Sequence, residues 1–120
     1  MKLIDLVEGL GLTVEVAGDT LDVEVTGGYA SDLISDVLAH AVAGDVWITL
    51  QTHQNIVAVA SLKELAGIVL VGGREPQEDT LLKAAQEGVP ILVSEMTTFE
   101  LVGRLYELGF RGAALEAVAL

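Results

Sequence analysis

Residues 44–93 read GDVWITLQTHQNIVAVASLKELAGIVLVGGREPQEDTLLKAAQEGVPILV, and their glycines and apolar runs indicate the architecture. Three times a glycine precedes a short run of β-type residues: Gly44 before 45–50, Gly67 before 68–71 and Gly88 before 89–93. Glycine is favoured just past the end of a helix, because it adopts a positive φ without a Cβ penalty. The repeat predicts helix–glycine–strand units, which imply right-handed βαβ crossovers and a parallel sheet.

Apolar residues at helical spacing predict the helices that connect these strands. The first runs from about residue 32 to 41 with Ser31 as its N-cap, and the third spans 78–87. The second, 55–66, can also be read as a strand; we favour a helix because Leu62 and Leu65 extend the helical period. The fourth begins with a capping box of Thr97 and Glu100 and ends at Gly109.

The N-terminal part shows a different pattern. Residues 2–10 predict a short amphipathic helix, whereas 12–16 and 21–25 both alternate apolar and polar residues around a turn at 17–20. Alternation of this kind predicts an antiparallel hairpin with one face in water. We therefore expect one α/β domain over residues 1–120: a parallel sheet flanked by helices, with an N-terminal antiparallel hairpin. The tail, 110–120, can be an edge strand, a helix or a partner-binding segment.

Charge and composition restrict the partners. Eighteen acidic residues against six basic ones give a net charge of −12, which disfavours nucleic acid and anionic membranes. The sequence has no cysteine, so disulfides, iron–sulfur clusters and thiolate zinc sites are excluded. Residues 1–8 do not resemble a signal peptide, and no apolar run reaches the roughly 18 residues of a membrane span. We expect a cytoplasmic protein without metal or cofactor.

Five runs of the sequence belong together, at residues 26–33, 44–55, 73–76, 87–92 and 97–100. As a set they resemble the DRTGG domain family, and the later ones are also similar to the N-terminal domain of HPr kinase/phosphorylase. The resemblance implies a mixed α/β fold like that of Mur-ligase N-terminal domains. It also implies an accessory role beside enzymes, hydrogenase systems among them, and it supplies no catalytic residue. The Asp-Arg pair that precedes Thr-Gly-Gly in the family is replaced here by Glu24-Val25. An anion contact made by that arginine would be missing.

Catalytic signatures are absent from the sequence. It contains neither G-x-x-x-x-G-K-[ST], G-x-S-x-G nor H-E-x-x-H, so we expect no enzyme.

The first candidate ligand site lies at residues 26–32. A predicted strand precedes it and a predicted helix follows, so Gly27, Gly28, Tyr29 and Ser31 would place free N–H groups near an anion. The alternative is a tight turn with Ser31 as the helix cap.

The second candidate follows the apolar run 45–50. Gln51, Thr52, His53 and Asn55 offer hydrogen-bonding side chains where ligands gather, beyond the carboxyl end of a strand. The alternative is an ordinary loop in which Thr52 or Asn55 caps the next helix. A histidine such as His53 could act as an acid or a base, but no carboxylate or serine is evidently placed to work with it.

Two further candidates follow the next strands. Arg74 suits a carboxylate or phosphate, or it pairs with Glu75 or Glu95. Thr97, at a helix start, suits an anion, although the capping box explains it equally well.

Two functions compete on these grounds. The first is a non-catalytic regulatory domain that binds a small anionic or nucleotide-like ligand in loops after Val25, Leu50, Val71 and Val93. The alternative is a ligand-free interaction module, working as a homodimer or as a subunit of an enzyme complex. Trp47, the hairpin and the tail would supply its contacts.

Overall fold

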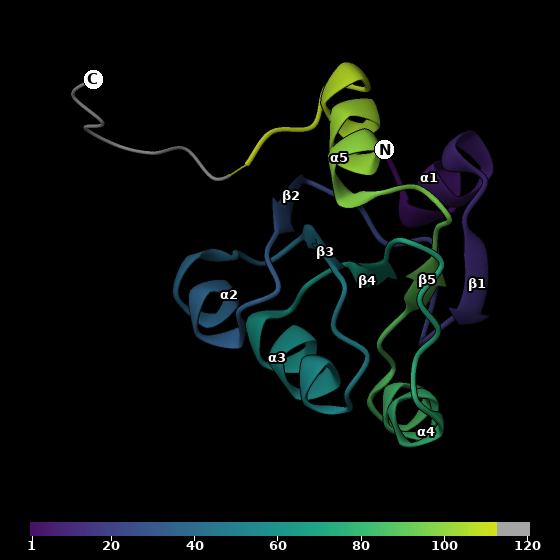
Figure 1. Cartoon of the computed structure of the whole chain (residues 1–120), viewed down its shortest axis with the longest axis vertical. Helices are drawn as coiled ribbons and strands as arrows, with labels where there is room; N and C mark the ends of the chain where they lie inside the picture. Colours follow the sequence, from purple (N-terminus) through teal and green to yellow (C-terminus); the bar gives the residue numbers. More distant parts are fainter. Residues whose placement is uncertain (113–120) are drawn as a thin grey trace.

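The computed structural model describes residues 1–112 and confirms the α/β architecture (Figure 1). Its elements, in chain order, are α1 (Leu3–Leu10), β1 (Thr13–Val16), β2 (Gly27–Ala30), α2 (Ile34–His40), β3 (Asp45–Thr49), α3 (Asn55–Lys63), β4 (Gly67–Leu70), α4 (Glu78–Glu87), β5 (Ile91–Val93) and α5 (Thr98–Glu107). The part of the tail from 113 to 120 lies outside the described residues. Within residues 1–112, no helix is long and apolar enough to cross a membrane.

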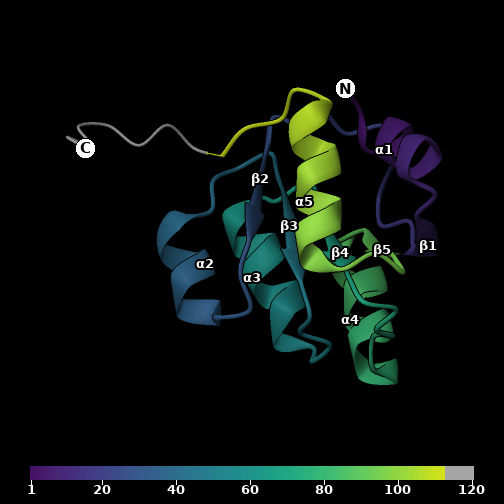
Figure 2. The same ribbon diagram turned by 45° about the horizontal axis from the view of Figure 1, so that its top comes forward.

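The described strands form one five-stranded sheet in the order β1-β5-β4-β3-β2. Strands β3, β4 and β5 run parallel, as predicted, and β2, which was not predicted, runs parallel to β3. Strand β1 joins β5 antiparallel. Helices α2, α3 and α4 cover one face of the sheet, and α1 and α5 cover the other (Figures 1 and 2). Every residue of β3, β4 and β5 is buried, because helices lie on both sides. This is why these strands are continuous apolar runs rather than alternating ones.

The predicted N-terminal hairpin is wrong. Strand β1 pairs with β5, and residues 21–25 run beside the start of α1 instead. Leu3 N donates to the Val23 carbonyl at 2.9 Å, and Val25 N donates to the Met1 carbonyl at 3.0 Å. Alternation shows that one face of a segment is buried, but it does not identify the segment's partner.

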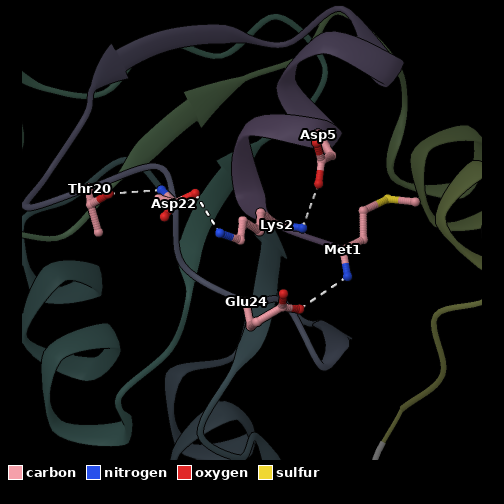
Figure 3. A network of polar contacts seen from close by, with 6 residues as sticks. All are labelled: Met1, Lys2, Asp5, Thr20, Asp22 and Glu24. Atoms are coloured by element: carbon pink, nitrogen blue, oxygen red, sulfur yellow. Dashed lines mark hydrogen bonds and ion pairs between the residues drawn. The ribbon is translucent and has the colours of Figure 1, made fainter.

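Charged side chains reinforce this arrangement at the N-terminus. The Met1 amino group lies 3.1 Å from Glu24, and Lys2 Nζ lies 2.8 Å from Asp22. Figure 3 shows these two ion pairs. The side chain of Asp5 accepts from Lys2 N at 2.8 Å. The strand-like segment 21–25 is thereby attached to α1 rather than to β1.

The predicted turn at 26–32 is also wrong in part, because Gly27 and Gly28 begin strand β2. The reason lies outside the local sequence. A Cβ on Gly27 would lie 2.7 Å from Asp45 Oδ1 and 2.8 Å from the Arg111 carbonyl oxygen. Gly28 N donates to that same carbonyl at 3.3 Å. Gly27 lets Asp45 and Arg111 approach β2 closely, and neither glycine forms an anion-binding turn.

The helix ends agree with the sequence only in part. Gly88 ends α4 in the left-handed conformation, and Thr97 caps α5 by accepting from Glu100 N at 3.3 Å. By contrast, α3 ends at Lys63, its C-cap is Glu64 with φ 55°, and Gly67 is the first residue of β4. Gly67 packs tightly, because a Cβ there would lie 3.1 Å from Leu3 Cδ2.

A buried carboxyl group at the start of β3 gives the stability a distinctive pH dependence. The Asp45 side chain accepts from Val42 N at 3.0 Å, and the residue is only 1% exposed. Burial raises the pKa of Asp45 above its ordinary value. The folded protein then holds this proton at a pH where the unfolded chain has lost it. Stability must therefore fall as pH rises from the unfolded pKa, about 4, through the raised folded pKa.

Asp45→Asn is expected to remove this loss, because the amide oxygen still accepts from Val42 N and carries no charge. Relative to wild type, the free energy of unfolding of the variant should rise by about 1 kcal/mol between pH 4 and pH 7. Urea denaturation at both values measures it. Asp36→Asn is the control, because the hydrogen bond from Tyr29 lowers the pKa of Asp36. Its relative stability should change with the opposite sign. If Asp45→Asn tracks wild type at both pH values, the burial argument is wrong.

Candidate functional site

The carboxyl ends of β2, β3, β4 and β5 lie at one edge of the sheet. We call the loops that follow them, residues 31–33, 50–54, 71–77 and 94–97, the carboxyl edge. Figure 2 shows the connections from β2 to α2 and from β3 to α3 turning at the lower end of the sheet. Open α/β sheets bind ligands at this kind of edge.

Asp32 joins the first two loops. Its Oδ1 accepts from the Thr49 hydroxyl at 3.0 Å and from Leu50 N at 2.7 Å. The Gln51 side-chain amide donates to the Asp32 carbonyl at 2.8 Å. Gln51 is therefore at the carboxyl edge as predicted, but its amide is engaged in holding the loops together. Local sequence does not reveal this role for Asp32, because its partners Thr49 and Leu50 come from the end of the next strand.

The loop from Thr52 to Asn55 is held mainly through its backbone. The Thr52 carbonyl accepts from the Thr80 hydroxyl at 2.7 Å and from Gln77 N at 3.3 Å. His53 is exposed, and its Nδ1 accepts from Asn55 N at 3.2 Å. Neither Thr52 nor Asn55 caps α3, because the N-cap position is Gln54 and makes no side-chain cap bond. Within residues 1–112, the side chains of Thr52 and Asn55 have no hydrogen-bond partner.

Two glycines connect the loops after β4 and β5. Gly72 and Gly73 both have φ of 68°, and their N–H groups donate to the Met96 carbonyl at 2.7 Å and the Ser94 carbonyl at 2.9 Å. A Cβ on Gly73 would lie 2.6 Å from Glu95 Oε2. Positive φ and close packing together explain this glycine pair.

Arg74 follows the glycines and is exposed. No ion pair joins it to any acid of the described chain, so the predicted alternative of pairing with Glu75 or Glu95 is wrong. Its surroundings are acidic, because Glu75 is the next residue along the chain. Glu75 also lies near Glu15, whose pKa is raised first by burial and then by Glu75. Arg74 brings positive charge to an edge that otherwise presents Asp32, Glu75 and Glu95.

Not all predicted site residues meet at this edge. Ser31, Gln51, Thr52, His53, Arg74 and Thr97 belong to it, and Asn55 opens the helix beside it. Ser31 does not cap α2; its hydroxyl accepts from Leu33 N at 3.2 Å. Thr97 is engaged as the cap of α5.

Gly27, Gly28 and Tyr29 lie apart from the other candidates. Gly27 pairs with Asp45, the first residue of β3, so both glycines are at the amino ends of the parallel strands. The Tyr29 hydroxyl donates to Asp36 at 2.8 Å, and its ring stacks on His40 with centroids 6.5 Å apart.

Trp47 was predicted as a possible partner contact, and that prediction is wrong. Its ring is 0% exposed, and its Nε1 donates to the Ser31 carbonyl at 2.9 Å. Trp47 lies in the core cluster that α2 and α3 cover. Its bond to Ser31 therefore holds the first loop of the carboxyl edge against the core.

These features define an α/β domain whose polar loops line the carboxyl edge of a parallel sheet. The sequence profile of the DRTGG domain matches residues 5–108, and the chain belongs to the DRTGG domain family. The resemblance drawn from the sequence is confirmed. A search of curated proteins found no match.

A solved structure shares the fold. It contains the CBS and DRTGG domains of the regulatory region of Clostridium perfringens pyrophosphatase, complexed with its activator, diadenosine tetraphosphate. The likeness has a TM-score of 0.63 at 11% identity and covers 85% of this chain. This chain spans 44% of that one, and at this identity the likeness concerns the fold alone.

Proposed function

We propose that this chain is a non-catalytic regulatory domain that binds a small anionic, nucleotide-like ligand at the carboxyl edge. One observation carries the proposal. The loops are held by backbone contacts and by Asp32, while Thr52, Asn55 and Arg74 keep side chains without partners among the described residues. Polar side chains without partners at the carboxyl edge of a parallel sheet can bind a ligand.

The chemistry of these groups favours a phosphate-bearing ligand. A guanidinium binds phosphate through two parallel hydrogen bonds, and Arg74 is exposed for that contact. Thr52 and Asn55 offer a hydroxyl and an amide, which suit the hydroxyls of a sugar or the edge of a base. Gly72 is exposed and has no side chain, so a ligand can approach the backbone there.

The structural relative supports the class of ligand. The pyrophosphatase regulatory region was solved with a dinucleotide that carries four phosphates. That complex contains CBS and DRTGG domains together, so it supports nucleotide binding by the whole region and not a position on this chain. The regulatory role proposed here also agrees with the absence of catalytic motifs from the sequence.

Arg74→Ala is expected to weaken binding of ATP or diadenosine tetraphosphate about tenfold or more, the usual effect of losing a charged hydrogen bond. Calorimetric titration of the full chain measures the affinity, and the thermal shift provides an independent signal because a ligand of the native state raises Tm. Arg104→Ala is the matched control. Arg104 is an exposed arginine on α5 that contacts Glu100 at 3.4 Å, and its removal should leave affinity unchanged.

Two outcomes would contradict the proposal. One is an unmodified chain that binds neither nucleotide up to about 1 mM, the weak limit of specific small-ligand affinities. The other is equal loss of affinity in Arg74→Ala and Arg104→Ala, which would indicate only a general charge effect.

A second candidate function is an interaction module, as homodimer or as subunit of an enzyme complex. The contacts first expected for it do not hold, because Trp47 is buried and the hairpin does not form. An exposed apolar surface on α5 favours it instead, since Phe99 is 88% exposed.

A further inference from the structure

We infer that two copies of this chain associate through α5, crossing antiparallel about a two-fold axis. One side of α5 is buried on the sheet through Leu101 and Leu105. The neighbouring side presents what we call the α5 stripe, which consists of Phe99, Val102, Gly103 and Tyr106. Phe99 is 88% and Tyr106 58% exposed, so two large aromatic rings lie in water on a strongly acidic protein. Exposed aromatic groups that adjoin one another commonly mark an interface.

Gly103 gives a second and independent indication. It lies in the middle of α5, where glycine costs about 1 kcal/mol relative to alanine. Its φ is not positive, and a Cβ there would meet nothing within 4 Å. Nothing in residues 1–112 therefore requires a glycine at this position. A second helix that crosses α5 at Gly103 would require a small residue there, because small residues let two helix backbones approach closely.

The surface beside the stripe is hollowed. A groove of about 520 Å³ is lined by the stripe itself and Thr98. A smaller hollow of about 80 Å³ lies between α5 and β2, lined by Tyr29, Ile48 and Phe110 among others. Apolar side chains of a partner helix would fill these spaces.

Local charge argues for a second copy as the occupant. The whole chain carries −12, which keeps copies apart over most of the surface. Residues 97–112 are balanced, because Glu100 and Glu107 are matched by Arg104 and Arg111. Arg111 lies over the Tyr106 ring with its Cζ 3.6 Å from the centroid. Copies can therefore approach at α5 without the repulsion that they meet elsewhere.

The order of residues along α5 sets the direction of the crossing. With the two-fold axis between Val102 and Gly103, Phe99 lies beside the partner's Tyr106. Glu100 then lies at nearly the height of the partner's Arg104, and each pair occurs twice because the interface is isologous. A parallel crossing would instead place Glu100 beside its own copy. The charge pattern is self-complementary only in the antiparallel direction.

The first test is sedimentation velocity of the full chain from about 5 to 500 µM, where modest interfaces become populated. We expect a concentration-dependent dimer. The double variant Phe99→Ser/Tyr106→Ser should weaken association at least about tenfold, since buried aromatic anchors dominate interfaces. Its circular dichroism should match wild type, because both side chains are exposed. Leu62→Ser and Leu82→Ser are controls, being exposed leucines on α3 and α4, and should leave the dimer intact.

A charge exchange tests the direction. Glu100→Arg alone gives a stripe flanked by two arginines, and Arg104→Glu alone gives one flanked by two glutamates. Each variant should be monomeric by itself, while an equal mixture should form heterodimers, because both cross-pairs become complementary. A wild-type chain that stays monomeric at the highest concentration would overturn the inference. So would a dimer that survives Phe99→Ser/Tyr106→Ser, or a mixture that remains monomeric. Arg74→Ala should not change association, so the test of the dimer is independent of the test of ligand binding.

Discussion

Gly18→Ala is expected to lower the free energy of unfolding by about 3 kcal/mol, because it combines backbone strain with a clash. Gly18 has φ of 69°, and a Cβ there would lie 2.7 Å from both the Gly88 carbonyl oxygen and Pro90 N. Both atoms are backbone, so no flexible side chain can move aside. The turn before residues 21–25 is fixed here against the end of α4, where Asp19 N donates to the Gly88 carbonyl at 3.2 Å.

Gly11→Ala separates the two causes. Gly11 has φ of 63°, yet a Cβ there would meet nothing within 4 Å. This variant should lose only about 1 kcal/mol, the cost of a left-handed alanine. Urea denaturation followed by circular dichroism measures both variants. Equal losses would show that the approach of Gly18 to Gly88 does not limit stability.

Trp47→Ala is expected to destabilise the fold by about 4 kcal/mol, the usual cost of removing a buried aromatic ring. Trp47 is 0% exposed and lies in a core cluster with Ile56 and Ile68. The substitution also leaves the Ser31 carbonyl without the N–H that it accepts at 2.9 Å. A cavity and an unpaired polar group therefore arise together, directly under the first loop of the carboxyl edge.

Trp47→Phe distinguishes these contributions. It keeps most of the ring volume and removes the donor, so it should lose about 1–2 kcal/mol. Far-ultraviolet circular dichroism is the appropriate probe, because both variants lack the only tryptophan in the sequence. Should Trp47→Ala retain stability within about 1 kcal/mol of wild type, the ring would not be the core element described here.

The sequence predicted the parallel part of the fold because those strands are covered on both faces. Burial on both sides leaves no choice but continuous apolar residues in β3, β4 and β5, and the chain between them must form helices. Such runs can be recognised without knowledge of their partners. The carboxyl edge follows from the same logic, since parallel strands deliver Gln51, Arg74 and Thr97 to one side of the sheet.

The failures have a common origin in contacts between distant residues. The alternation at 21–25 correctly indicates one-sided burial, but the prediction is wrong for 12–16, where Val14 is exposed and Glu15 is half-buried. The partners of the two segments, α1 and β5, cannot be deduced from alternation. Gly27 is a strand residue because of Asp45 and Arg111, which lie far along the chain. Asp32 falls at the start of the first predicted helix, at about 32–41, whereas the partners of its side chain are Thr49 and Leu50.

The α5 stripe was missed although its signal is local. Phe99, Val102 and Tyr106 fall within the fourth predicted helix, 97–109, and the helical period alone does not separate the side facing the sheet from the side facing water. The informative residue was Gly103, an unusual choice within a helix. A helix-interior glycine beside aromatic residues is a pattern worth weighing in similar sequences.

The measurement that most directly tests ligand binding at the carboxyl edge is a titration of the isotope-labelled full chain with diadenosine tetraphosphate, followed by backbone amide NMR. We predict that the amides of Thr52, His53, Gly73 and Arg74 shift together with a single affinity, while those of Gly27, Gly28 and Gly103 stay in place. A spectrum that does not change, or one in which only β2 or α5 responds, would contradict a ligand site at this edge.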